Sequence, residues 1–167
     1  MKTTPTQRRD RLHELARLLR QLATTTHEAS TGPEAETLVK KGHDVFWMGT
    51  FGLRYLSEDP DSECGTIACA LGYASMHPPF QEQGLHMHWT RWDAVSQGVV
   101  RDQLSHGFVH YGDQDNAKTS LEAGMYFFGL NVIEAAQLFD PDPNMRTTLE
   151  ARAILADALA DMPPSPR

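Results

Sequence analysis

The stretch from Cys64 to Met76 contains no charged side chain, and its apolar and small residues leave no polar face for solvent. A helix that is apolar on all sides is normally buried. The small residues, Gly72 among them, would let neighbouring backbones approach closely. A glycine inside a helix costs about 1 kcal/mol relative to alanine unless packing compensates for it. The pattern therefore predicts a buried central helix, with Thr66 as its N-cap.

Residues 7–25 show the clearest amphipathic pattern, because their apolar side chains recur at a spacing of three and four. These side chains are Leu12, Leu15, Ala16, Leu19, Leu22 and Ala23. Residues 24–33, rich in threonine and containing a Gly-Pro pair, are typical of a linker. The apolar stripe must be buried against either the body of the chain or a second copy. The sequence thus predicts an N-terminal helical arm, with a homodimer through residues 7–25 as one of its two outcomes.

Helix signals return in the C-terminal half of the chain. Capping pairs at Thr119 with Glu122 and at Asn131 with Glu134 predict two helices, which end near residues 128 and 139. A last helix is predicted to begin near Thr148 and to end at the Pro-Pro pair 163–164. Its expected buried stripe comprises Ala151, Ile154, Leu155, Ala158 and Met162.

The segments 45–53 and 85–89 are the candidates for extended structure. Short apolar runs such as 45–53 are not assigned by periodicity alone, so a strand and an extended buried segment both stay open. Residues 90–104 are predicted to form a modest helix and residues 105–118 a loop. The expected fold is mainly α, a compact single domain of about five to six helices around the buried central helix. A short two-stranded β-ribbon from 45–53 and 85–89 is an open addition.

The predicted organisation has an arm and linker at 1–30, a globular helical domain at 31–162 and a tail at 163–167. The 167 residues carry a net charge of −7, but residues 1–20 carry six basic and two acidic side chains, so the remainder carries −11. Such an acidic body repels nucleic acid and favours a protein partner with a basic surface. No apolar run is long enough to cross a bilayer. Two cysteines without an export signal indicate a reducing compartment, so a cytoplasmic location is expected.

Cys64 lies where the amides of the predicted central helix begin. A helix N-terminus lowers the pKa of a thiol, and a neighbouring histidine would make that thiol a nucleophile. The alternative is that Cys64 and Cys69 are small buried hydrophobic residues. A pocket at this helix end, facing residues 43–55, would suit an anionic or nucleotide-like ligand. Its candidate ligand-binding residues are His43, Arg54, Cys64, Thr66 and Arg91, and no catalytic residue is assigned.

Eight histidines offer a second kind of site. His86 and His88 would share one face of a strand, and His106 and His110 one face of a helical turn, which makes a zinc site an open alternative. Their spacing matches no known ligand pattern. Surface or core hydrogen bonding is the competing interpretation, and no metal or cofactor is predicted.

Three motifs resemble a pattern found in small uncharacterised proteins of bacteriophages and bacteria: an aromatic-Met segment at Phe46 to Phe51, a Cys-Gly-Thr-x-x-Cys-x-x-Gly start at Cys64, and Phe128-Gly129-Leu130 followed by Glu134-Ala135 and Leu138-Phe139. The likeness spans roughly residues 43–160. That group has no assigned activity, so the resemblance assigns no catalytic role. It implies a phage-type accessory protein that binds a host factor, for example as an inhibitor of host defence, or sequesters a small molecule. A small-molecule or nucleotide-binding protein, a cysteine-dependent enzyme and a zinc-binding protein remain as alternatives.

Overall fold

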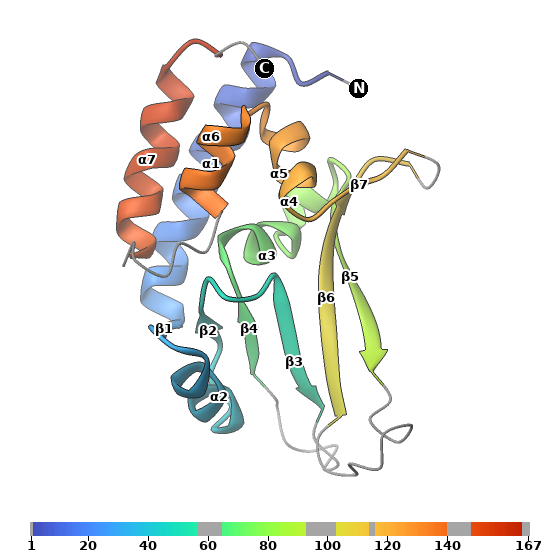
Figure 1. Ribbon diagram of the computed structural model, residues 1–167. Helices are drawn as coiled ribbons and strands as arrows, with labels where there is room; N and C mark the ends of the chain where they lie inside the picture. Colours follow the sequence, from blue (N-terminus) through green and yellow to red (C-terminus); the bar gives the residue numbers. More distant parts are fainter. Residues whose placement is uncertain (1, 57–64, 93–102, 114–115, 140–147, 165–167) are drawn as a thin grey trace.

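The chain forms a mixed α/β structure. The computed structural model describes residues 2–56, 65–92, 103–113, 116–139 and 148–164, and all statements below concern these residues. Within them, a seven-stranded sheet packs against a layer of helices (Figure 1). Most of the helices gather toward one end of the sheet, the helix Gly32–Lys40 lies apart from them, and the long strands extend beyond the larger group.

The sheet has the strand order β1-β2-β4-β3-β6-β5, and β7 pairs with β6 beside this path. The pairs β1–β2 and β2–β4 are parallel, and the other pairs are antiparallel. The strand bounds are His27–Glu28 (β1), Val45–Phe46 (β2), Gly52–Leu56 (β3), Thr66–Ala68 (β4), Leu85–Trp92 (β5), Gln103–Tyr111 (β6) and Lys118–Thr119 (β7). The mainly α prediction is therefore wrong.

Strand β6 accounts for much of that error. Its first two residues belong to the predicted helix 90–104, and the others belong to the predicted loop 105–118. Successive side chains of a strand point to opposite faces. One face of β6 carries the buried Val109, whereas the other carries His106, Phe108 and His110. Because histidine is neither clearly apolar nor clearly polar, His106 and His110 weaken the alternation of apolar and polar residues by which a strand is recognised. The ribbon prediction is also wrong, since segments 45–53 and 85–89 both enter the sheet but do not pair with each other.

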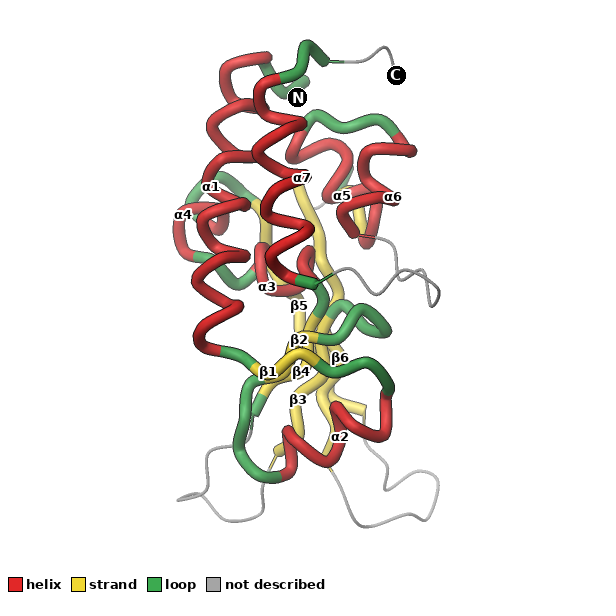
Figure 2. The backbone as a smooth tube through the Cα atoms, turned by 90° about the vertical axis from the view of Figure 1, so that its left-hand side faces the viewer, coloured by secondary structure: helices red, strands yellow, loops and turns green. Residues whose placement is uncertain are grey.

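Seven helices are described: Pro5–Thr25 (α1), Gly32–Lys40 (α2), Ala70–Ser75 (α3), Pro78–Gln81 (α4), Ser120–Phe128 (α5), Val132–Phe139 (α6) and Leu149–Asp161 (α7). Helices α1 and α7 lie side by side (Figures 1 and 2). Five of the six predicted stripe residues of α1 are buried in the main core together with residues of α3, α5, α6 and α7, whereas Ala23 is exposed. The stripe thus packs within its own chain, and a dimer contact through residues 7–25 would have to use other side chains.

The predicted central helix is wrong in its first half. Thr66 lies in β4, which pairs with both β2 and β3, and the helix α3 begins only at Ala70. Its N-cap is Cys69, whose Sγ accepts a hydrogen bond from the Gly72 amide at 3.4 Å, so Thr66 is not the cap. The predicted burial is confirmed, because Ile67 and Leu71 are at most 1 % exposed and Tyr73 is 9 % exposed.

Candidate functional site

The structure brings only part of the predicted ligand-binding set together. Arg54 and Thr66 lie directly opposite each other in the β3–β4 ladder, and Arg91 lies opposite Ser105 in β5–β6. His43 precedes β2, is exposed, and has its ring 4.4 Å from that of His27. Cys64 lies outside the described residues.

The amides at the start of α3 already have partners within the chain. The Cys69 amide donates to the Thr50 carbonyl at 2.9 Å, and the Gly72 amide donates to the Cys69 thiol. The helix N-terminus that was expected to receive an anion is therefore a strand-to-helix junction closed by its own hydrogen bonds. Burial raises the pKa of the Cys69 thiol, which favours the protonated, structural form.

Arg54 instead covers an aromatic ring. Its guanidinium carbon lies 4.3 Å from the ring centroid of Trp89, within the range of a cation–π contact. The Trp89 ring reaches across β6 and β3 over two glycines, since a Cβ on Gly52 or Gly107 would lie 3.0–3.1 Å from it. These glycines thus leave room for the indole, since a side chain on either would meet it.

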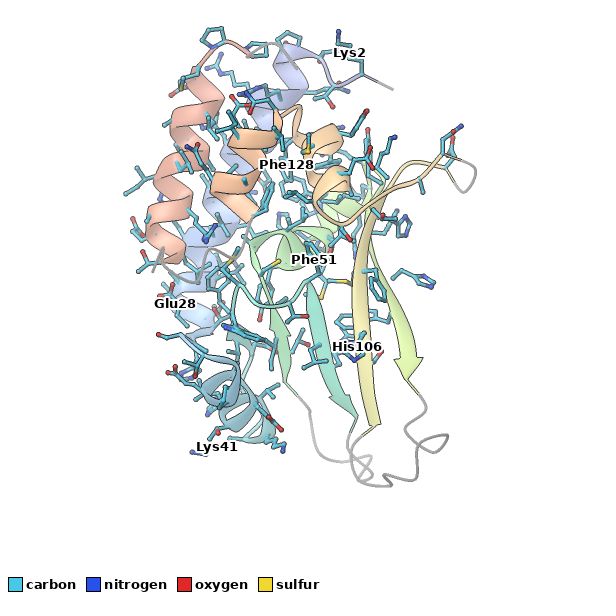
Figure 3. All side chains as sticks on the ribbon, in the orientation of Figure 1. Lys2, Glu28, Lys41, Phe51, His106 and Phe128 are labelled. Atoms are coloured by element: carbon cyan, nitrogen blue, oxygen red, sulfur yellow. The ribbon has the colours of Figure 1, made fainter. Side chains whose placement is uncertain are left out.

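All four candidate histidines lie on one face of β5 and β6, and three of them have their rings close together. His86 lies opposite His110 in the ladder, with ring centroids 5.5 Å apart, and the ring of His88 is 6.3 Å from that of His110. Burial and the two neighbouring imidazoles lower the pKa of His110. His106 lies on the same strand as His110, not on a helical turn, in the part of the sheet that projects beyond the helices (Figure 3).

No group of three or more histidine, cysteine, aspartate or glutamate side chains in the described part of the chain is arranged to hold a metal ion. A zinc site built from all four histidines therefore has no support in the present arrangement of their rings.

A polar hollow of about 330 Å³ lies between α1 and α4. It was not predicted, because its residues come from two helices that are distant in sequence. The arginines Arg11 and Arg17 and the carboxylates Asp10 and Glu14 line it, so its formal charges balance. Glu14 is engaged by Arg17 at 2.6 Å and by His77 at 2.7 Å. The hollow thus offers no net charge to select a ligand.

Exposed apolar side chains lie on the outward side of α7. Ile154 is 57 % exposed and Met162 is 53 % exposed, and Ala151 and Ala158 on the same side are also exposed. Ala151, Ile154 and Ala158 are spaced by three and four positions, so they form one stripe along the helix, and Met162 follows directly as its C-cap. We call this set, Ala151, Ile154, Ala158 and Met162, the α7 outer stripe. On the neighbouring helix α6, Val132 and Ile133 are 60 % and 67 % exposed.

The α7 outer stripe comprises four of the five residues that the sequence analysis assigned to the buried side of this helix. That assignment is wrong, and only Leu155 of the five is partly buried against the core. Helix α7 is apolar on two sides, so a residue pattern alone does not say which one faces inward. The side that packs inward carries Leu149, Arg152, Ala153, Ala156, Leu159 and Ala160.

Buried arginines fix α7 against its neighbours. The Arg8 guanidinium donates to the Glu134 carboxylate at 3.0 Å and to the Leu159 carbonyl at 3.1 Å, which ties α1, α6 and α7 together. Arg152 donates to the carbonyls of Gln137 and Leu138 at the end of α6. Hydrogen bonds that involve a charged group contribute about 1.5–3 kcal/mol each. The outer stripe is thus presented on a firmly held helix.

Carboxylates flank the α7 outer stripe. Glu150 and Asp161 are exposed. From α1, His13 contacts both Asp157 at 2.8 Å and Asp161 at 3.2 Å, and Arg20 forms an ion pair with Asp157 at 2.7 Å. Partial burial alone would raise the pKa of Asp157, but the hydrogen bonds from His13 and Arg20 outweigh it and lower that pKa. Arg20 offsets the charge of Asp157, so Glu150 and Asp161 are the exposed carboxylates of this flank.

Comparison with known proteins gives no further guide. The chain matches no protein-family profile, no curated protein and no solved structure. Among the helices in the described ranges, none combines the length and apolar character that crossing a bilayer requires.

Proposed function

We propose that this protein acts by binding another protein rather than by catalysis, and that the α7 outer stripe is the docking surface. The observation that carries the proposal is the exposure of Ile154, on the side of α7 that faces away from the core, and of Met162 at the C-cap of that helix. An apolar patch with a polar rim is typical of a protein–protein interface. The apolar side chains would supply the centre of that interface.

Charge indicates the kind of partner. The stripe is flanked by the exposed carboxylates of Glu150 and Asp161, and the whole chain carries a net charge of −7. An apolar element with basic side chains at its edge, such as an amphipathic helix, complements this arrangement. Electrostatic complementarity of this kind raises association rates and excludes acidic competitors.

The motif resemblance extends the proposal to biology. On that basis the protein is a phage-type accessory protein that works in the cytoplasm, and its partner is a basic host protein whose activity it blocks. The acidic surface and the α7 outer stripe support a binding role. The phage character derives from the motifs described above.

A matched pair of variants tests the docking surface. Tagged wild-type protein is used to capture partners from host lysate beside Ile154→Asp and Phe108→Asp. Phe108 is a suitable control because it is 48 % exposed on the sheet, away from α7, and receives the same chemical change. Both substitutions are at exposed positions, so stability should change by no more than about 0.5 kcal/mol.

The expected result is a basic protein that wild type and Phe108→Asp retain equally and that Ile154→Asp loses at least about tenfold, as for an interface hot spot. Its retention should fall as the salt concentration rises, because the charged rim is screened. Equal retention by both variants would remove the α7 outer stripe from the proposal.

A further inference from the structure

A second feature, separate from the proposed docking surface, is the face of β5 and β6 that carries the histidines. His86 and His110 occupy directly opposed positions of an antiparallel ladder, and side chains at such positions point to the same face of a sheet. Their ring centroids lie 5.5 Å apart with an interplanar angle of 34°. His86 is exposed and His110 is partly buried, so one imidazole is anchored and the other is free to turn.

This separation is close to that of two imidazoles on one metal ion. With zinc–nitrogen bonds of about 2.0–2.1 Å, two histidine ligands of a zinc ion have ring centres roughly 5 Å apart. A small rotation of the exposed His86 side chain closes the remaining difference. His88, whose ring is 6.3 Å from that of His110, stands on the same side as a nearby third imidazole.

The ring nitrogens of this pair have no competing use in the described part of the chain. His86 and His110 have ring contacts there, but no hydrogen bond or ion pair to another described residue. By contrast, His13 and His77 are bound to carboxylates. The imidazoles of His86 and His110 therefore keep their lone pairs available to an incoming ligand.

We propose that His86 and His110 form a two-imidazole binding site for a divalent transition metal of the Zn²⁺, Ni²⁺ or Cu²⁺ class, with solvent in the remaining coordination positions. Imidazole nitrogen suits these ions, whereas Ca²⁺ and Mg²⁺ require oxygen ligands. Two protein ligands agree with the absence of a ready group of three or more among the described residues. The site is independent of the α7 outer stripe, which lies on the helical layer.

Calorimetric titration of the full chain with zinc chloride at neutral pH tests the site. The variants are His86→Gln and His110→Gln, and the control is His43→Gln, because His43 also stands beside a second histidine, His27, but with ring centroids only 4.4 Å apart. Thermal denaturation of each variant without metal establishes that it is folded. In the same titration, the imidazole proton resonances of His86, His110 and His43 are followed by NMR.

The expected result is uptake of one zinc ion per chain. Affinity should fall at least about tenfold in His86→Gln and in His110→Gln, since removing even an outer-shell partner of a metal ligand costs 10–100-fold. It should be unchanged in His43→Gln and in excess Mg²⁺. The proposal is overturned if wild type takes up no zinc, if both ligand variants bind it as wild type does, or if His43→Gln loses as much affinity as they do.

Discussion

Replacement of Gly72 by alanine tests why the charge-free stretch fits where it does. A Cβ on Gly72 would lie 1.7 Å from the carbonyl oxygen of Phe51 and 2.9 Å from the Cβ of Ala68. Contacts below 3.0 Å are essentially never found for real Cβ atoms, so backbone would have to move by more than 1 Å. Neither neighbour is the end of a flexible side chain that could turn away.

The magnitude follows from two opposed effects. Alanine gains about 0.8–1 kcal/mol over glycine in a helix. Overpacking a well-packed core costs about 1–3 kcal/mol and occasionally more, and a clash with backbone belongs at the upper end of that range. We therefore expect a net loss of about 2 kcal/mol in the free energy of unfolding, which corresponds to a Tm lower by about 4–8 °C for a chain of this size.

Gly124→Ala in α5 is the matched control. There a new Cβ would meet the Leu71 methyl groups at 3.1 Å and a ring carbon of Phe139 at 3.2 Å, which are side-chain atoms able to shift by a few tenths of an ångström. Its expected effect on stability is near zero. Urea denaturation of both variants measures the difference. If Gly72→Ala were as stable as Gly124→Ala or the wild type, the close approach of α3 to Phe51 would be refuted.

Two further substitutions probe the packing of the helices on the sheet and on each other. Tyr73→Phe should cost about 1–2 kcal/mol, because the buried hydroxyl donates to the Val45 carbonyl at 2.9 Å; chemical denaturation measures the loss, and an unchanged midpoint would contradict the bond. Burial raises the pKa of Glu14, but hydrogen bonds from Arg17 and His77 outweigh it, so its pKa lies below the ordinary value of 4.5. Glu14→Gln should therefore destabilise the protein by about 0.5–1 kcal/mol above that pH. The difference should vanish as the pH falls through the lowered pKa, because both proteins are then uncharged at this position; melting curves across this range check it.

Local signals in the sequence were strong enough to predict most helices. The capping pair Asn131 and Glu134 forms as expected, with reciprocal hydrogen bonds of 2.8 and 2.9 Å, and the side chain of Thr148 caps α7. The apolar spacing of α1 also identified residues that are fully buried. These features depend on neighbours three or four positions apart, which a single sequence displays directly.

The sheet and the α7 outer stripe depend on contacts between distant segments, and there the predictions were wrong. Strand β4 was predicted as part of a helix because α3 begins only two residues after Ala68. The strands that pair with β4 lie elsewhere in the chain, so its own sequence does not show them. The two apolar sides of α7 are equivalent until α1 and α6 pack on one of them. His86 and His110 likewise come together only through the register of β5 and β6. They are 24 positions apart in the sequence, so the sequence alone does not show that they are neighbours.

Photo-crosslinking from the α7 outer stripe tests the central claim, that this surface docks a partner protein, most directly. A benzoylphenylalanine placed at Ile154 is irradiated in host cells, with the same group at Phe108 as the control. The account predicts an adduct with one basic protein from position 154 and none with that protein from position 108. An adduct at twice the mass of the chain, or no adduct from 154 in folded protein, would contradict it.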